Sequence, residues 1–498
     1  MAARRGERTV EAAVSKPGDT AAYSWLLLLQ GPNLIRSVVL TGAVTIHALS
    51  VRVVVTVLPS AVAEIGGLRF FSWTMTIAMI SAIWGAVTAA PLVVSRGLRT
   101  AYWIALALFV CGSITCAASP DMAVFLAGRM LQGLGGGLLT ALAYTTISRV
   151  FPASLHPRAI ALLSAVWGVA AFSGPLVGGL LAGWGRWRWA FWIDVPLAVL
   201  VGVMARRAIL PQAGAAASSP ARPQPIAFFR LALLAGSVLA VATAGLSEHM
   251  AASGLGVVVA AVLLLAMLRL DGSAARRAGL PRLLPSCAFD PRAPLGAVSL
   301  VMSLVGGCTM AVIYVPYVVT HVGMHAPITG GYLSAVIPLS WAVAALASAS
   351  AAPAWAPRLI VGGPVLVASG LIFTGCSLAT GSVVLIAAAL VPVGVGIGAA
   401  WAYLGALMVE LAEPKERDAA AAFISTNNLL SQAFGAAFAG VIANIAGFGN
   451  PALGATGIVS AVRWLFLLIA PFPLAALPFA IRAARISARL RNATAAAA

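Results

Sequence analysis

Five polar residues stand inside long apolar runs of the sequence, where polar groups are rare and are usually tied to function. They are two arginines, a histidine, a glutamine and an aspartate: Arg52, Arg129, His47, Gln132 and Asp194. A guanidinium in such a run normally faces the protein interior or a water-filled cavity, and a histidine or a carboxyl can carry a proton there. These five residues are therefore the first candidates for a functional role within the membrane.

Arg129 and Gln132 are three residues apart, so they lie on the same face of a helix. Two interpretations are open for the arginine. It either lines a cavity and takes part in function, or it belongs to a buried structural ion pair.

Arg52 is near the middle of the apolar run over 38–63, too deep for its side chain to reach either end. We expect it to face a cavity or an acidic partner. His47 is five residues earlier, about 140° around a helix, so the two side chains need not share a face. A single histidine in an apolar helix is more often an ordinary core residue, and a role in proton transfer is the alternative.

Acidic residues are scarce, with 13 Asp and Glu in the chain. Only Asp194 and Glu410 fall within predicted spans. Asp194 lies about one turn into the predicted span over 189–208 and near Arg186 and Arg188, so we expect an ion pair there. We expect Glu410 to be a solvated helix end, with a proton site as the alternative. The centre of the membrane would then hold two arginines and no clear acid. A positive cavity attracts anions, so we hypothesise an anionic or zwitterionic substrate.

The composition is that of a membrane protein. Of 498 residues, 61% are hydrophobic and only 9% are charged, against about 25% charged in soluble domains. Many apolar runs exceed the roughly 18 residues that mark a membrane-spanning helix. The net charge of +18 could suggest a nucleic-acid partner. However, the basic residues fill short gaps between apolar runs, as in membrane proteins, so we expect a lipid bilayer and no nucleic acid.

The apolar runs predict an all-α protein with fourteen membrane-spanning helices, arranged as six, two and six. We expect them over 38–63, 72–94, 101–118, 122–148, 159–183, 189–208, 228–247, 251–269, 294–320, 328–351, 359–378, 382–411, 419–446 and 457–481. Most Lys and Arg then fall on one side of the membrane, which predicts that both ends of the chain are cytoplasmic.

The predicted division of the chain follows from this layout. It consists of a cytoplasmic tail over 1–37, a six-helix bundle over 38–208, a middle segment over 209–293, a second six-helix bundle over 294–481 and a cytoplasmic tail over 482–498. The middle segment holds a linker rich in Pro, Ala and Ser, the two extra helices and a basic cytoplasmic loop.

Small residues mark one helix as a close-packing element. Gly174, Gly178 and Gly179 let a neighbouring helix approach, and Pro175 bends the helix. Either they serve packing alone, or they form a seam that gates a cavity. In the second half Asn427 and Asn428 are the best polar candidates, because buried amides need partners. The aromatic residues Tyr314, Tyr317, Tyr332, Trp401 and Tyr403 either line a cavity or pack between helices.

Two runs, GRMLQGLGGG and SGPLVGGLLAGWGRWRW, resemble motifs of the major facilitator superfamily and of its fourteen-helix drug:proton antiporter branch. The matching residues of the first run are Arg129, Gln132, Gly133 and Gly135. Those of the second run, the antiporter motif of that family, are Gly174, Pro175, Gly178 and Gly179. The resemblance implies two six-helix bundles with two extra helices. It also implies that Arg129 lines the cavity and influences proton transfer.

Two segments depart from the family pattern. In LSVRVVVTVLP, Ser50 stands where the family has an acidic residue, and Arg52 stands where it has a threonine. The loop PLVVSRGLRT keeps Arg96 and Arg99 but has Ser95 in place of an aspartate. In the family that aspartate belongs to a charge network that gates the cytoplasmic side, so this network is in doubt here.

We therefore expect a secondary active transporter of the inner cell membrane that exports small amphipathic solutes or drugs in exchange for protons by alternating access. The alternative is an exchanger or facilitator of organic anions without proton coupling, and a non-transporting membrane sensor is a remote one. The sequence has no ATP-binding P-loop and no metal-ligand spacing, and we expect neither an enzyme nor a cofactor.

Overall fold

The computed structural model describes residues 30–150, 156–208, 228–247, 250–278, 284–285, 287–349, 355–413, 417–448 and 450–497. Over these residues the protein is helical, without β-strands. Thirteen helical segments of the described chain are long and apolar enough to cross a membrane. A shorter apolar helix, α8, packs beside α9. The protein is therefore a multi-pass membrane protein, and its helices fit the predicted fourteen-helix fold.

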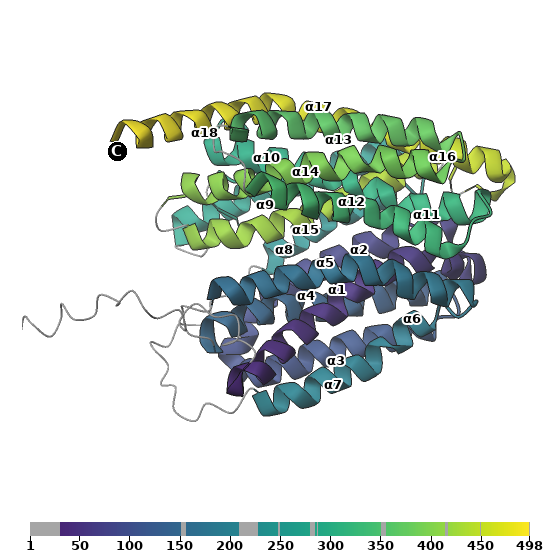
Figure 1. Cartoon of the computed structure of the whole chain (residues 1–498), viewed down its shortest axis with the longest axis horizontal. Helices are drawn as coiled ribbons and strands as arrows, with labels where there is room; N and C mark the ends of the chain where they lie inside the picture. The colour runs from purple at the N-terminus through teal and green to yellow at the C-terminus, as the bar shows by residue number, and fades with distance from the viewer. Residues whose placement is uncertain are drawn as a thin grey trace, which may run out of the picture.

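The first half of the chain forms the lower layer of Figure 1, in purple and blue. Its helices are α1 (Gly31–Ile65), α2 (Trp73–Arg96), α3 (Leu98–Ala117), α4 (Met122–Val150), α5 (His156–Gly183), α6 (Trp189–Trp192) and α7 (Asp194–Ala208). A single turn of 3-10 helix, η5 (Leu68–Phe70), stands between α1 and α2. The extra pair is α8 (Phe228–Ala244) and α9 (Met250–Ala278).

The second half forms the upper layer, in green and yellow. Its first span combines α10 (Pro294–Cys308), η7 (Thr309–Tyr314), α11 (Val315–Tyr317) and η8 (Val318–Val322). The others are α12 (Pro327–Ala349), α13 (Ala356–Leu378), α14 (Val383–Leu411), α15 (Arg417–Ile445) and, after η10 (Pro451–Leu453), α16 (Gly454–Ile469) with α17 (Pro471–Ala475) and α18 (Leu477–Ala497). We call the end where α1 begins the proximal end and the opposite one the distal end.

Three helices extend beyond their predicted bounds. Helix α1 begins at Gly31, inside the expected tail over 1–37. The expected tail over 482–498 is helical through Ala497, because its alanine-rich sequence continues the last span as α18. Arg482 on that helix donates from Nη1 to the Pro291 carbonyl at 2.8 Å, which fastens it to the segment that precedes α10.

The third is the second helix of the extra pair, which we expected to end at residue 269. Helix α9 continues to Ala278, and Asp271 is a buried residue of it. Its Oδ1 lies 2.5 Å from Nη1 of Arg230 on α8, and its Oδ2 accepts from the Leu284 amide at 3.3 Å. A buried charge is stable only when it is paired, so this pair holds the two extra helices together.

Glycines let α4 lie directly against α2 and α3. A Cβ atom at Gly137 would stand 2.0 Å from the Ala82 carbonyl oxygen of α2. One at Gly135 would stand 2.5 Å from the Phe109 amide nitrogen of α3. Any side chain there would push the helices apart. This tight packing sets the position of Arg129, which is on the same helix.

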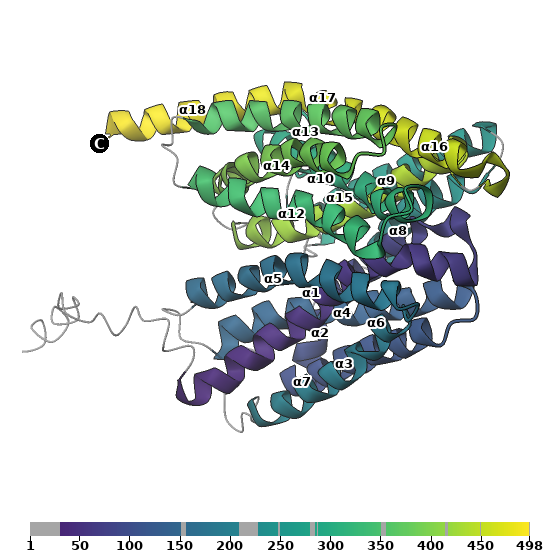
Figure 2. The same ribbon diagram turned by 45° about the vertical axis from the view of Figure 1, so that its right-hand side comes forward.

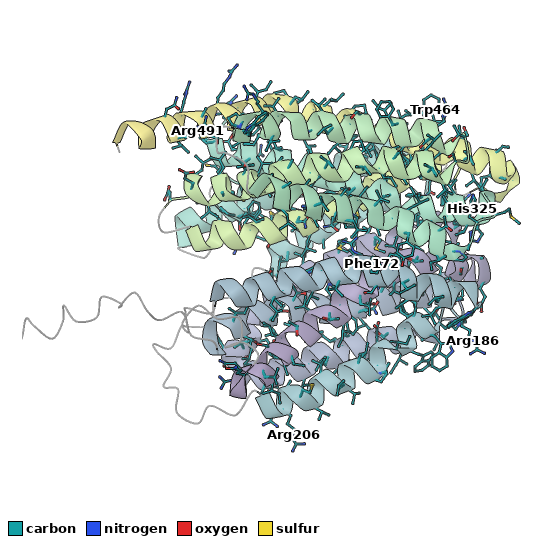
Figure 3. All side chains as sticks on the ribbon, viewed as in Figure 1. Phe172, Arg186, Arg206, His325, Trp464 and Arg491 are labelled. Atoms are coloured by element: carbon teal, nitrogen blue, oxygen red, sulfur yellow. The ribbon has the colours of Figure 1, made fainter. Side chains whose placement is uncertain are left out.

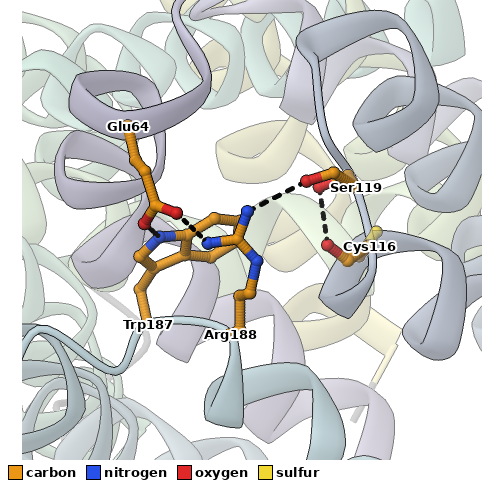
Figure 4. A network of polar contacts seen from close by, with 5 residues as sticks. All are labelled: Glu64, Cys116, Ser119, Trp187 and Arg188. Atoms are coloured by element: carbon orange, nitrogen blue, oxygen red, sulfur yellow. Dashed lines mark hydrogen bonds and ion pairs between the residues drawn. The ribbon is translucent and has the colours of Figure 1, made fainter.

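A polar clamp ties the distal end of the first half together (Figure 4). The buried Trp187 donates from Nε1 to Glu64 Oε2 at 2.6 Å. Arg188 forms an ion pair with Glu64 and donates from Nη2 to the Ser119 carbonyl at 3.0 Å. Ser119 in turn donates from Oγ to the Cys116 carbonyl at 2.7 Å. The clamp joins the end of α1, the α3–α4 connection and the entry to α6.

The two halves make many of their contacts near the distal end. In Figure 2 the ribbons of the two layers lie closer together there than at the proximal end, on the left. Phe71, just after η5, packs its ring against those of Tyr314, Tyr317 and Phe448, at centroid distances of 5.2, 5.6 and 5.6 Å. We call these four residues the aromatic cluster. Asn444 adds a hydrogen bond from Nδ2 to the Arg69 carbonyl at 2.9 Å.

Candidate functional site

Gln132 is the centre of a buried group of polar side chains from four helices. Its Nε2 lies 2.9 Å from Ser50 Oγ on α1 and 3.0 Å from Ser113 Oγ on α3. The same nitrogen lies 3.0 Å from Asp194 Oδ2 on α7. Ser113 also donates to Asp194 Oδ2, at 3.2 Å. We call Ser50, Ser113, Arg129, Gln132 and Asp194 the polar cluster, and each is at most 3% exposed.

Arg129 joins this cluster through the other end of the same amide. Its Nη1 donates to Gln132 Oε1, and its Nε donates to the Thr74 carbonyl at 3.4 Å. Gln132 therefore bridges a buried cation and a buried carboxyl. Each charge has hydrogen-bonding partners, as a charge in a low-dielectric interior requires.

Two expectations about Asp194 are wrong. It does not pair with the neighbouring arginines, because Arg188 binds Glu64 and Arg186 is exposed at the distal end (Figure 3). The centre of the first half also does not lack an acid, since Asp194 faces inwards to Gln132. The positive charge of Arg129 is therefore balanced, and the case for an anionic substrate then depends on Arg52.

Arg52 faces α5 from α1. A Cβ atom at Gly174 would stand 2.4 Å from Arg52 Cβ. The Arg52 Nε atom is buried, and it has no hydrogen-bond partner among the residues that the structure describes. Thr56, one turn further on the same face of α1, meets Gly331 of α12. Arg52 therefore lies one turn to the proximal side of a contact between the two halves.

The predicted glycine motif lies in that contact. Gly178 packs on α1, where its Cβ position is 2.9 Å from Thr56 Cβ. Gly179 packs on α12, where a Cβ atom at Gly179 would stand 2.5 Å from the Ile328 Cα atom. Pro175 meets Gly331 of the same helix. We call this junction of α1, α5 and α12 the seam. The glycine motif of α5 thus packs against α1 within the first half and also against α12 of the second half.

His47 is a buried aromatic residue on another face of α1. A Cβ atom at Gly136 would stand 2.0 Å from its Nδ1, and its ring lies edge-on to those of Phe109 and Trp167. It also borders a small cavity, with space for about one water molecule. The lining residues are His47, Ser50, Val51, Ala78, Met79, Arg129, Gln132 and Gly133. The role of His47 in proton transfer stays a prediction.

The two asparagines of α15 have different surroundings. Asn427 is fully buried, accepts from Ser303 Oγ at 2.7 Å and donates to the Ser299 carbonyl of α10 at 3.3 Å. It therefore links two helices of the second half. Asn428 is half-buried and accepts from Gln432 Nε2 at 3.0 Å. Asn428 is therefore the more accessible of the two, and its role in binding a solute stays a prediction.

Aromatic residues of the second half also differ in their surroundings. Tyr314 and Tyr317 belong to the aromatic cluster at the distal end, so they do not line a central cavity. Trp401 is half-buried, and its ring centroid lies 5.0 Å from that of Trp341 on α12. Tyr332 of α12 faces Phe172 of α5 across the seam, with ring centroids 6.0 Å apart.

Arg96 and Arg99 lie at the proximal end. Arg96 ends α2 and is exposed, and Arg99 is on the first turn of α3 and half-exposed. Gly97 between the helices has φ +80°, which glycine adopts without strain. The turn therefore keeps both arginines at one surface of the bundle.

The family model of the major facilitator superfamily matches residues 40–391. The chain belongs to the major facilitator superfamily. A "Probable multidrug-efflux transporter" of Mycobacterium tuberculosis is 35% identical over 456 residues, which cover 89% of this chain and 93% of that protein. The multidrug transporter protein MdtP of Bacillus subtilis is 27% identical over 183 residues, or 36% of this chain and 34% of that protein. The chain is thus a member of a family of membrane transporters.

Solved structures of this superfamily share the fold. The POT family transporter PepTSo aligns with a TM-score of 0.64 and 16% identity, over 92% of this chain and 99% of its own. A D-xylose–proton symporter aligns with a TM-score of 0.61 and 15% identity, over 90% and 97%. The predicted fold class is confirmed.

Ser113, which hydrogen-bonds both Gln132 and Asp194, could not be recognised from the sequence. A serine in an apolar helix of this superfamily is a weak signal, because such hydroxyls usually bond to their own backbone. Only the packing of α3 against α4 and α7 distinguishes Ser113 from the other serines of the membrane-spanning helices.

Proposed function

We propose that this transporter exports small amphipathic solutes in exchange for protons, by alternating access, and that the polar cluster carries the proton. The observation that supports this most is the bridge from Arg129 through Gln132 to Asp194. A carboxyl that is held beside a buried cation is a group whose protonation changes the local charge balance. Such a change is what a coupled transporter needs.

In this proposal Asp194 replaces the acid that is missing from the first helix. The resemblance to drug:proton antiporters implies an acid at the position of Ser50. Ser50 and Asp194 both lie at hydrogen-bond distance from the same nitrogen of Gln132. A carboxyl at either position would therefore reach the same partner, so the coupling acid has moved from the first span to the sixth.

A proton on Asp194 would remove the negative charge that faces Gln132 and, through it, Arg129. The cluster draws on α1, α3, α4 and α7, which all belong to the first half. Its rearrangement would shift α1 against α5 and thereby act on the seam. The cycle requires a second state in which the halves meet at the proximal end instead of the distal one.

We assign the proximal end to the cytoplasm and the membrane to the inner cell membrane. The positive-inside rule supports this orientation, since Arg96, Arg99 and Arg206 lie at that end. Both termini would be cytoplasmic. The state described above would then be closed towards the outside.

The aromatic and amide side chains of the second half support an amphipathic solute. Trp341, Trp401 and Asn428 offer flat apolar surface with few hydrogen-bonding groups, as sites for small organic ligands do. A relative that covers most of the chain carries a name that refers to multidrug efflux. The substrate class is therefore proposed as broad.

The test uses the purified chain in proteoliposomes that hold a pH-sensitive dye, under an imposed proton gradient. Anionic and cationic amphiphiles are added in parallel. Proton flux that depends on the solute supports antiport. Solute movement down its own gradient with no proton flux contradicts it.

A second candidate function is an exchanger or facilitator of organic anions without proton coupling. The observation that favours it is Arg52, whose buried Nε has no partner among the described residues. Counterflow of a labelled anion, unaffected by collapse of the proton gradient, would support this candidate against the first.

A further inference from the structure

Arg52 is a half-buried cation in the middle of a membrane-spanning helix, and it belongs to neither of the ion pairs found among the described residues. Its Nε is buried and has no hydrogen-bond partner among the described residues. Leaving a buried charged donor without a partner is strongly unfavourable. Such a group either lowers the stability of the fold or completes its hydrogen bonds with a ligand that binds reversibly.

The carboxyls of the neighbouring spans are engaged elsewhere. Asp194 on α7 accepts from Ser113 and lies against Gln132. Glu64, three turns further along α1, is bound by Trp187 and Arg188 at the distal end. These two acids therefore serve other partners.

The position of Arg52 is one that a substrate would reach. It lies one turn to the proximal side of the Thr56–Gly331 contact, where the seam closes the distal side. Gly174 brings α5 against its Cβ, and the arginine as a whole is only half-buried. A solute that enters from the proximal end would stop at the seam, beside this group.

Aromatic side chains stand at the same junction. Phe172 is two residues before Gly174 on α5, and its side chain lies between the two halves in Figure 3. It is 56% exposed. Its ring faces that of Tyr332, the residue after Gly331. An apolar ring system could pack here while a charged group reached the arginine.

We infer that Arg52 binds the anionic group, a carboxylate or a sulfonate, of an aromatic solute that the transporter carries through the seam. The guanidinium forms paired hydrogen bonds with such planar oxyanions, which a lysine ammonium does not reproduce. This inference rests on the proposed transport function and narrows its substrate class.

The test measures equilibrium binding to the full chain in lipid nanodiscs, without a proton gradient. Three probes share one ring system and differ in charge: naphthalene-2-carboxylate, neutral naphthalene-2-carboxamide and cationic 2-naphthylmethylammonium. We expect the carboxylate to bind at least about tenfold more tightly than the carboxamide. Arg52→Gln should abolish this preference and leave the affinity for the carboxamide unchanged. Arg52→Lys should keep part of the preference, which guards against a folding defect in the first variant.

Arg206→Gln is the matched control, because it also removes one positive charge, from an exposed position at the proximal end. It should retain the wild-type preference. A wild-type preference for the cation, or equal affinity for all three probes, would overturn the inference. So would an equal loss of affinity for all three probes in Arg52→Gln. Because the assay needs no gradient, failure of proton coupling is detected separately, in the flux experiment.

Discussion

Arg129 on α4 and Asp194 on α7 are joined through one side-chain amide, that of Gln132. The amide oxygen accepts from the arginine, and the amide nitrogen lies 3.0 Å from the carboxylate oxygen. A glutamine in this position transmits a change of charge at one residue to the hydrogen bonding of the other.

Replacing Asp194 by asparagine should separate transport from proton movement. Asparagine retains a side-chain oxygen for Gln132 but has no proton to exchange. We expect proton flux that depends on the solute to fall by about a hundredfold or more, while counterflow of solute persists. Dye-loaded proteoliposomes measure the first and labelled solute the second. Glu410→Gln, at an exposed position near the end of α14, is the control and should leave both unchanged. Undiminished proton flux in Asp194→Asn would rule out this carrier.

Moving the acid back to α1 should restore part of the coupling. Ser50 and Asp194 share the Gln132 nitrogen, so Ser50→Asp combined with Asp194→Asn keeps one carboxyl beside it. We expect this double variant to recover proton flux that Asp194→Asn alone has lost. If the double variant folds and still transports solute but shows no recovery, the two positions are not equivalent.

Glycine should be essential at Gly137. The carbonyl oxygen of Ala82 is 2.0 Å from the place of a Cβ atom, so Gly137→Ala should destabilise the fold by about 1–3 kcal/mol. Gly168→Ala is the matched control, because no atom lies within 4 Å of its Cβ position. Melting of the purified protein in one detergent compares the two. A Gly137→Ala variant as stable as the control would mean that α2 and α4 separate easily.

Widening the seam should open the distal end. In Gly179→Ala the new methyl group would lie 2.5 Å from Ile328 Cα and push α5 from α12. A cysteine at Ser72, buried against Gly440 of the other half, serves as the reporter after the native cysteines are replaced. We expect faster labelling by a membrane-impermeant maleimide in Gly179→Ala than in Gly183→Ala, whose Cβ position is free. Equal labelling rates would show that the seam does not control this end.

Patterns within one helix could be predicted well from the sequence. The three-residue spacing of Arg129 and Gln132 places them on one face, and the hydrogen bond between them confirms this. The close approach of helices at Gly174 and Gly178 was expected for the same reason, because glycine spacing is a local property.

Relations between helices could not be predicted in this way. Arg188 is six residues from Asp194 in the sequence, yet it binds Glu64, far away in the chain, because the α5–α6 connection folds over the end of α1. Asp194 instead meets α3 and α4. Hydropathy locates each span, but it carries no information about which spans are neighbours or how each is rotated.

The aromatic cluster also bears on how often the distal end opens. Phe71 is 1% exposed, and its partner rings come from the other half. Drawing that ring into water costs about 2–3 kcal/mol, which disfavours the distal-open population by a factor of about 30–150. The proton and the solute together must therefore favour the distal-open state by at least that factor. Burial of the Phe71 ring therefore sets a minimum free energy of about 2–3 kcal/mol that opening of the distal end requires.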